Sequence, residues 1–198
     1  MKFIDKQKND IITQLTVIAN NINLTNESYL TSYPYFLDYF KNLTSIKRDN
    51  LIIGISFTYS WMPTILKSIN LDRCDEIIMI LNEVKNGQII SEQKLTALKI
   101  AFNNSLVGSS KLLHFINPKQ YAIWDSRVFR SLYNEAPHKY KLERPDTYLT
   151  YLKLIEELKD QTTFQSFFEL MTQKVGYEIT EYRAVELALF RGQVEAKV

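Results

Sequence analysis

Apolar residues recur at helical spacing along most of the chain, and this periodicity limits the possible folds more than any other feature of the sequence. In residues 3–23, Ile11, Leu15, Ile18 and Ile22 follow one another every three or four positions, with polar residues between them. This is the pattern of one face of a helix. The same pattern predicts further helices over 34–43, 50–62, 72–86, 93–103, 111–116, 146–160, 162–175 and 180–191. The sequence therefore predicts an all-α protein.

Two of these segments are apolar on most sides, as is expected of a buried helix. Residues 50–62 meet this condition along their whole length, and we expect them to form a central helix. Residues 182–190 meet it apart from Arg183 and Glu186. Both segments should therefore lie in the core.

Turn and capping residues mark the ends of several predicted helices. Asn86-Gly87 is a typical C-terminal stop, Pro34 suits the first turn of a helix, and Thr162 to Gln165 matches a capping box. The clearest loop lies over 134–146 and is marked by Pro137 and Pro145.

The composition excludes several classes of protein. Over 198 residues the formal net charge is only +2, so any nucleic-acid surface must come from local clusters of charge. The single cysteine, Cys74, excludes an intrachain disulfide and a four-cysteine iron–sulfur site and favours a cytoplasmic location. With only two histidines beside it, we expect no metal and no cofactor. No apolar stretch approaches the roughly 18 residues of a membrane span, so we expect no membrane partner.

The stretch that is densest in chemically usable residues is 106–130. Gly108 follows a polar run, where a glycine permits the positive φ of a tight hairpin. Ser109 or Ser110 could then cap a short helix over 111–116. Asn117-Pro118 would end that helix, because the residue before a proline disfavours helical dihedrals.

A short, partly apolar connector, Tyr121 to Trp124, leads from this helix to Asp125. The aspartate falls at the N-cap of a further helix that carries Arg127 and Arg130. Helix, hairpin, helix, and then a carboxylate at a helix start is the order found in one large class of DNA-binding enzymes.

These residues resemble the helix-hairpin-helix DNA glycosylases, most closely the 8-oxoguanine glycosylase branch. In that branch the hairpin has the sequence Gly-[Val/Ile]-Gly-x-Lys, and a catalytic aspartate follows the next helix. Residues 106–110, Leu-Val-Gly-Ser-Ser, match the hairpin, and Ala122-Ile123-Trp124-Asp125 matches the aspartate segment. Leu106 replaces the first glycine, and Ser110, one residue before Lys111, replaces the lysine that forms a Schiff base.

Two further segments, Tyr59 to Thr64 and Tyr182 to Glu186, resemble uncharacterised bacterial proteins that are grouped with the same fold. The resemblance implies a compact, two-lobed helical domain with a helix-hairpin-helix motif. We expect this single domain to span 1–198, with the hairpin and the active-site segment at 103–133.

The resemblance implies two catalytic residues, Asp125 and Lys111. A glycosylase holds a flipped base in a pocket, and a carboxylate beside the sugar stabilises the positive charge that forms as the bond breaks. A lysine amine that attacks the sugar would also cleave the strand through a Schiff base. The serine at 110 makes this lyase activity doubtful. Each residue also has an ordinary alternative, Asp125 as a helix cap and Lys111 as a surface lysine near a phosphate.

The hairpin would bind a DNA phosphate through backbone N–H groups at a helix N-terminus, without any base contact. The residues assigned to DNA binding are Val107, Gly108, Ser109, Ser110, Arg127 and Arg130.

The two tryptophans have two possible roles each, and the two histidines are expected to differ in burial. Trp61 and Trp124 could sandwich a flipped base, but each has an equally good role in the core. His114 lies on an apolar helix and is expected to be a hydrogen-bonded core residue, whereas His138 should be exposed.

The sequence thus favours a DNA-binding protein that resembles a base-excision glycosylase of the 8-oxoguanine type, with DNA as its partner. Two alternatives stay open. One is a non-catalytic DNA-binding or regulatory module on the same fold, and the other is an all-helical protein-interaction domain.

Overall fold

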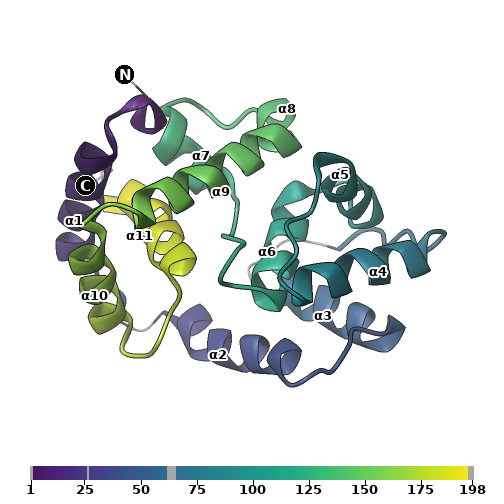
Figure 1. Cartoon of the computed structure of the whole chain (residues 1–198). Helices are drawn as coiled ribbons and strands as arrows, with labels where there is room; N and C mark the ends of the chain where they lie inside the picture. The colour runs from purple at the N-terminus through teal and green to yellow at the C-terminus, as the bar shows by residue number, and fades with distance from the viewer. Residues whose placement is uncertain (1, 26, 62–65, 196–198) are drawn as a thin grey trace. The chain divides into compact units, whose positions relative to one another are not determined.

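The computed structural model describes residues 2–25, 27–61 and 66–195. In these ranges the chain forms eleven α-helices and one short 3-10 helix, η1, and no β-strand (Figure 1). The all-α prediction is therefore confirmed. Contacts divide the chain into two compact units: unit 1 is Met1–Asn26 with Ile123–Val198, and unit 2 is Glu27–Ala122.

Unit 2 is built around one buried helix. Its helices are α2 (Ser28–Lys41), α3 (Arg48–Trp61), α4 (Cys74–Lys85), α5 (Glu92–Ala101) and α6 (Leu106–Ile116). The central helix is α6, which contacts each of the other four. Every residue of α6 except Val107 is buried, as expected of a helix surrounded on all sides.

The prediction that residues 50–62 form the central helix is wrong in its position, although the helix itself is confirmed as α3. Only one face of α3 is buried, and it carries Leu51, Ile55 and Tyr59. Ile53 on another face is 50% exposed. Apolar composition alone cannot distinguish a helix at the centre of a unit from one that leaves apolar side chains at the surface.

The predicted helix start at Pro34 is also wrong, because α2 begins at Ser28 and contains Pro34 in its interior. A proline there removes one hydrogen bond of the helix. Burial of Leu30 and Tyr33, before the proline, favours the longer helix. Packing of these side chains thus offsets the missing bond.

Unit 1 is likewise built around one helix. Its elements are η1 (Phe3–Asp5), α1 (Lys8–Asn21), α7 (Ser126–Tyr133), α8 (Lys139–Leu142), α9 (Pro145–Lys159), α10 (Phe164–Val175) and α11 (Glu181–Glu195). The central helix is α11, which contacts α1, α7, α9 and α10. Residues 182–190 are all buried, so the sequence-based expectation for this segment is confirmed.

Two local predictions in unit 1 are corrected. The range 134–146 is not loop throughout, since it contains α8 and the first turn of α9, where Pro145 occupies a position that suits proline. The capping box at Thr162 to Gln165 does not form. Instead α10 begins at Phe164, and the hydroxyl of Thr163 donates to Oδ1 of Asn9 at 3.2 Å.

No helix among the described residues is long and apolar enough to cross a membrane.

Candidate functional site

A short turn, Phe102 to Ser105, joins α5 to α6, and we refer to it as the hairpin. Asn103 and Asn104 take left-handed conformations in it, with φ of 57° and 50°. Asparagine tolerates this region better than most residues because its short polar side chain bonds locally. The predicted turn at Gly108 is therefore wrong in its position, because Gly108 lies in the first turn of α6.

Hydrogen bonds from a neighbouring segment hold the hairpin in one shape. Oδ1 of Asn103 accepts from the backbone N–H groups of Lys67 and Ser68, at 2.8 and 2.7 Å. Ile69 and Phe102 form an isolated antiparallel bridge. The turn is thus braced by chain that lies more than thirty residues earlier.

The first turn of α6 is capped by a serine that precedes the predicted one. Oγ of Ser105 accepts from the N–H of Gly108 at 3.2 Å, and its carbonyl accepts from the N–H of Ser109 at 3.1 Å. Ser109 and Ser110 are not caps, because both lie within the helix, and their hydroxyls donate to the carbonyls of Ser105 and Val107.

This geometry leaves few groups of residues 107–110 available for the phosphate contact that was expected there. The side chains of Ser109 and Ser110 are buried, and the N–H groups of Gly108 and Ser109 already donate within the first turn. The exposed residue of the hairpin is Asn104. A phosphate that approaches the hairpin from solvent would meet this residue first.

A glycine is required at 108 because the ring of Tyr59 lies against its backbone, and not because the backbone has a positive φ. A Cβ built on it would lie 2.1 Å from the hydroxyl oxygen of Tyr59 and 2.5 Å from the ring carbon that bears it. The Tyr59 hydroxyl in turn donates to the carbonyl of Phe102 in the hairpin, at 3.2 Å. The missing side chain therefore lets α3 brace the hairpin.

We expect Gly108→Ala to destabilise the protein by about 1–3 kcal/mol, because the added methyl group overpacks this contact. At an open helical position the same change would stabilise by up to about 1 kcal/mol. Chemical denaturation of the single variants and of Gly108→Ala with Tyr59→Ala measures the coupling. A penalty that persists in the Tyr59→Ala background would show that the close approach is not its cause.

Lys111 is only 3% exposed on α6. The alternative interpretation of a surface lysine is therefore wrong. Lys111 belongs to unit 2, as does the hairpin, whereas Asp125 belongs to unit 1.

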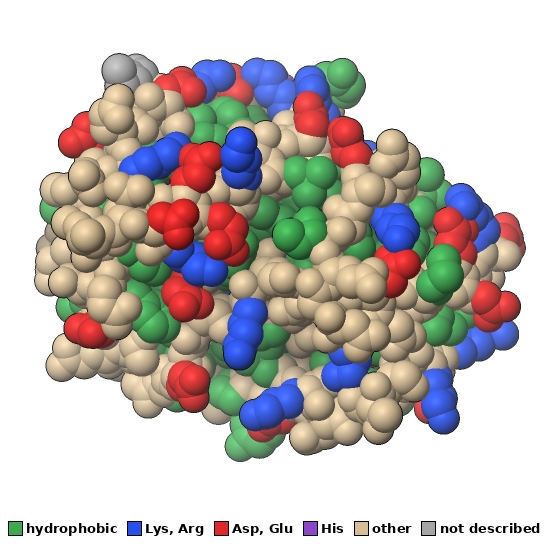
Figure 2. Space-filling view, in the orientation of Figure 1, with side chains coloured by type: hydrophobic (Ala, Val, Ile, Leu, Met, Phe, Trp, Pro, Cys, Tyr) green, Lys and Arg blue, Asp and Glu red, His purple; other side chains and the backbone are tan. Residues whose placement is uncertain are grey.

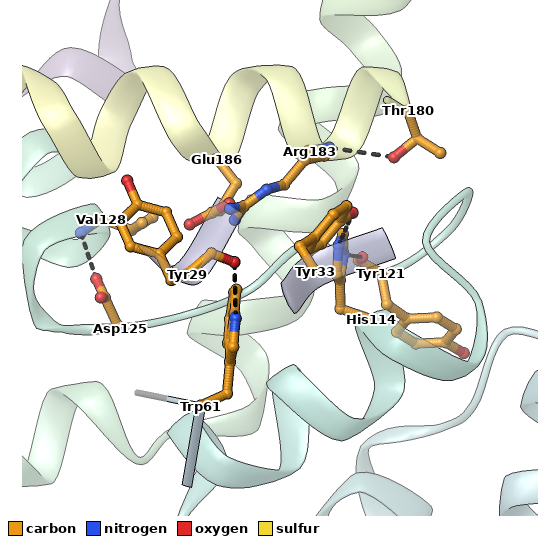
Figure 3. A network of polar contacts seen from close by, with 10 residues as sticks. All are labelled: Tyr29, Tyr33, Trp61, His114, Tyr121, Asp125, Val128, Thr180, Arg183 and Glu186. Atoms are coloured by element: carbon orange, nitrogen blue, oxygen red, sulfur yellow. Dashed lines mark hydrogen bonds and ion pairs between the residues drawn. The ribbon is translucent and has the colours of Figure 1, made fainter. Parts of the chain in front are cut away.

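His114 ties α6 to α2 and to the chain that follows α6 (Figure 3). Its Nδ1 lies 2.6 Å from the carbonyl oxygen of Tyr121, and its Nε2 lies 2.7 Å from the hydroxyl of Tyr33. A carbonyl only accepts, so Nδ1 carries the proton, and in the neutral ring Nε2 accepts from Tyr33. The side chain is fully buried, which confirms the prediction of a hydrogen-bonded core histidine.

Tyr121, the first residue of the connector, is held within unit 2 by its hydroxyl. Its hydroxyl donates to the carbonyl of Gln88 at 3.0 Å and accepts from the N–H of Ile90 at 3.1 Å. Asn117, just before the connector, donates to the carbonyl of Val84 at 3.0 Å. These bonds hold Asn117 and Tyr121 against α4 and the segment that follows it.

Asp125 is the N-cap of α7, as predicted. Its Oδ1 accepts from the backbone N–H groups of Arg127 and Val128 at 2.8 and 2.9 Å, the second of which is drawn in Figure 3. The residue is 8% exposed. The two amides fix the carboxyl group at the start of the helix, whose dipole favours a negative charge there.

The two tryptophans have structural contacts. Trp124 is fully buried, donates from Nε1 to the carbonyl of Leu142 at 2.8 Å, and packs against Phe129. Trp61 is half-buried and donates from Nε1 to the carbonyl of Tyr29 at 2.9 Å. Trp124 therefore serves the core of unit 1, and Trp61 is the one of the two with accessible surface.

The two arginines of α7 differ in their surroundings. Arg127 is exposed, and its guanidinium stacks over the ring of Phe190, 4.6 Å from the centroid. Such a contact holds the cation at the surface while its donors stay in reach of solvent. Arg130 is half-buried.

A buried ion pair on α11 was not identified from the sequence as part of any site. Arg183 and Glu186 are each 2% exposed, and their side chains are paired by a hydrogen bond. Thr180 accepts from the N–H of Arg183 at 3.2 Å and so caps α11 (Figure 3). The only signal of the Arg183–Glu186 pair in the sequence was two opposite charges three residues apart in an otherwise apolar helix.

Charge is mixed on the face of the molecule drawn in Figure 2. Figure 2 shows Lys and Arg side chains interspersed with Asp and Glu over the visible face, without one large basic area. His138 is exposed, as predicted. Among the described residues, no group of three or more His, Cys, Asp or Glu side chains is placed to hold a metal ion.

Comparison of the chain with family models, with curated proteins and with solved structures gives no match.

Proposed function

We propose that this chain binds DNA through the hairpin and excises a damaged base, with Asp125 as the catalytic carboxylate. The observation that carries the proposal is the order of α5, the hairpin, α6 and the connector, followed by a helix capped by a largely buried aspartate. This order is the one that the resemblance to 8-oxoguanine glycosylases implies. The hairpin and Asp125 are each held by hydrogen bonds from the backbone.

Base excision needs a fixed negative charge more than it needs a proton carrier. The glycosidic bond breaks with positive charge on the sugar, and a carboxylate in a site from which water is excluded stabilises this charge strongly. Asp125 meets the structural requirement because two amides fix its position and little of it faces solvent.

We propose excision without strand cleavage. The residue at the position of the Schiff-base lysine is Ser110, whose hydroxyl donates to the carbonyl of Val107 at 3.0 Å. A serine cannot form the imine on which lyase chemistry depends. The same substitution favours a second candidate function, a non-catalytic DNA-binding module on this fold.

We expect Asn104→Asp to weaken binding of duplexes of any sequence. Aspartate also tolerates the left-handed conformation of residue 104, so the change chiefly adds a negative charge where a phosphate would approach. The loss should be several-fold at low salt and smaller at high salt.

A titration of labelled duplex at two salt concentrations measures this effect. The matched control is Asn134→Asp, which changes another exposed asparagine with positive φ, of 51°, at the end of α7. Equal affinities for wild type, Asn104→Asp and Asn134→Asp would remove the hairpin as the phosphate contact.

A duplex with a cationic pyrrolidine in place of one deoxyribose tests the catalytic part of the proposal. The charged ring mimics the sugar as the bond breaks, and analogues of this kind bind on the order of a hundredfold or more tighter than ground-state ligands. Wild type should prefer it to an undamaged duplex by about that factor. Equal binding of both duplexes would contradict base excision and leave the non-catalytic DNA-binding module as the remaining candidate function.

A further inference from the structure

Tyr151 carries a buried hydroxyl that no described residue satisfies. The side chain lies on α9 and is 0% exposed. Its Oη has no hydrogen-bond partner among the residues that the structure describes. Buried hydroxyls nearly always have a partner, because an unmade bond leaves the whole cost of desolvation in place. A group of this kind therefore needs an explanation.

Three charged side chains of unit 1, Glu186, Asp125 and Arg183, act electrostatically on the Tyr151 hydroxyl. The ring of Tyr151 packs against Trp124 with centroids 5.5 Å apart, and Trp124 directly precedes Asp125. Helix α9 also contacts α11, which carries the buried pair of Arg183 and Glu186. A buried titratable group on which several charges act is a candidate for a functional site.

The hydroxyl is a donor at physiological pH. Burial raises the pKa of Tyr151 well above its ordinary value, and the charges of Glu186, Tyr148 and Asp125 raise it further, against the opposite effect of Arg183. The phenol therefore keeps its proton, and Asp125 is among the charged groups of unit 1 that act on it.

A hydrogen-bond donor in the same unit as the proposed catalytic carboxylate has a defined use in base excision. When the glycosidic C–N bond breaks, its electron pair goes to the base, and negative charge builds on the nitrogen and carbonyl oxygens of the base. Water then supplies the hydroxyl group that bonds to the sugar carbon, and its proton neutralises the base. Asp125 would stabilise the sugar, which leaves the departing base in need of a hydrogen-bond donor.

We propose that the Tyr151 hydroxyl contacts the substrate and donates a hydrogen bond to the purine base that is excised. This inference rests on the proposed function and adds to it the residue that binds the leaving base. It also accounts for the missing partner, because the substrate supplies it.

The test uses a duplex with one 8-oxoguanine whose sugar carries a 2′-fluorine. The fluorine withdraws electrons and prevents the bond from breaking, so that binding is measured alone. Wild type, Tyr151→Phe and Tyr182→Phe are compared for the ratio of affinities between this duplex and an undamaged one, and for the melting midpoint. Tyr182 is the matched control, since it is a buried tyrosine of unit 1 whose hydroxyl donates to Oε1 of Glu156 at 2.5 Å.

We expect Tyr151→Phe to lower the affinity ratio about three- to tenfold, the effect of one lost hydrogen bond. Its melting midpoint should stay the same or rise by a few degrees, because an unsatisfied group is removed. Tyr182→Phe should lower the midpoint and keep the ratio.

Two results would overturn the inference while leaving the proposed function standing. One is a ratio that Tyr151→Phe does not change. The other is a fall in its midpoint as large as that of Tyr182→Phe, which would mean that the hydroxyl bonds an ordered water and is structural. If wild type itself does not prefer the lesion duplex, the proposed function fails for this substrate, and the inference falls with it.

Discussion

Replacement of Asp125 by asparagine is expected to slow base excision on the order of a hundredfold or more, the usual cost of removing an electrostatic stabiliser of the transition state. Asparagine caps a helix about as well as aspartate. The two amides that donate to Oδ1 would therefore keep an acceptor, and the stability should change by at most about 1 kcal/mol. DNA affinity should hold or rise, because a negative charge is lost next to the proposed position of the DNA backbone.

Single-turnover excision, a binding titration and a melting curve on the same variant separate the capping role of Asp125 from its proposed catalytic role. Asp146→Asn is the matched control, since Oδ1 of Asp146 also accepts a backbone N–H at a helix start, that of Thr147 at 2.8 Å. Excision that stays at the wild-type rate in Asp125→Asn would assign the residue to capping alone. A large fall in melting temperature would show that its chief role is structural.

Glu186→Gln should have the largest effect on stability, a loss of about 3–5 kcal/mol, which is typical when one partner of a buried ion pair is removed. Glutamine keeps the size of the side chain but withdraws the negative charge from the buried guanidinium of Arg183. For a chain of this length, such a loss lowers the melting midpoint by about 6–20 °C.

The chain offers a control with the same spacing for this measurement. Arg73 and Glu76 also form an ion pair three residues apart, but the Arg73 side chain is 69% exposed. Glu76→Gln should therefore cost no more than about 1 kcal/mol. Similar melting midpoints for the two variants would contradict the view that the Arg183–Glu186 pair supports the core of unit 1.

Features that depend on local chemistry could be predicted from the sequence. The cap by Asp125 follows from its place before a periodic segment, and Gly87, with φ of 83°, ends α4 as the Asn86-Gly87 pair predicted. Residues 182–190 are buried because apolar residues occupy nearly every side of that helix. Each of these predictions needed only neighbouring residues.

The turn between α5 and α6 was predicted in the wrong place because its position depends on distant contacts. Locally, Gly108 is the best candidate for a turn, yet the turn falls on Asn103 and Asn104, where the chain at 67 and 68 supplies two N–H donors. The glycine is instead explained by the ring of Tyr59. No sequence pattern around 108 carries that information.

The same limit applies to the buried polar groups of unit 1. The spacing of Arg183 and Glu186 equals that of Arg73 and Glu76, and only tertiary packing makes the first pair buried and the second exposed. Tyr151 could not be distinguished from Tyr148, the other tyrosine of the predicted helix over 146–160. Its unsatisfied hydroxyl appears only when the surrounding helices are in place.

The most direct test of the proposed function is a single-turnover incubation of wild type and Asp125→Asn with duplexes that each carry one damaged base, 8-oxoguanine among them, followed by alkali. We predict alkali-labile abasic sites at one or more of these bases with wild type, few or none with Asp125→Asn, and no strand breaks before alkali. The absence of abasic sites on every duplex, from folded protein that binds those duplexes, would contradict excision and favour the non-catalytic DNA-binding module.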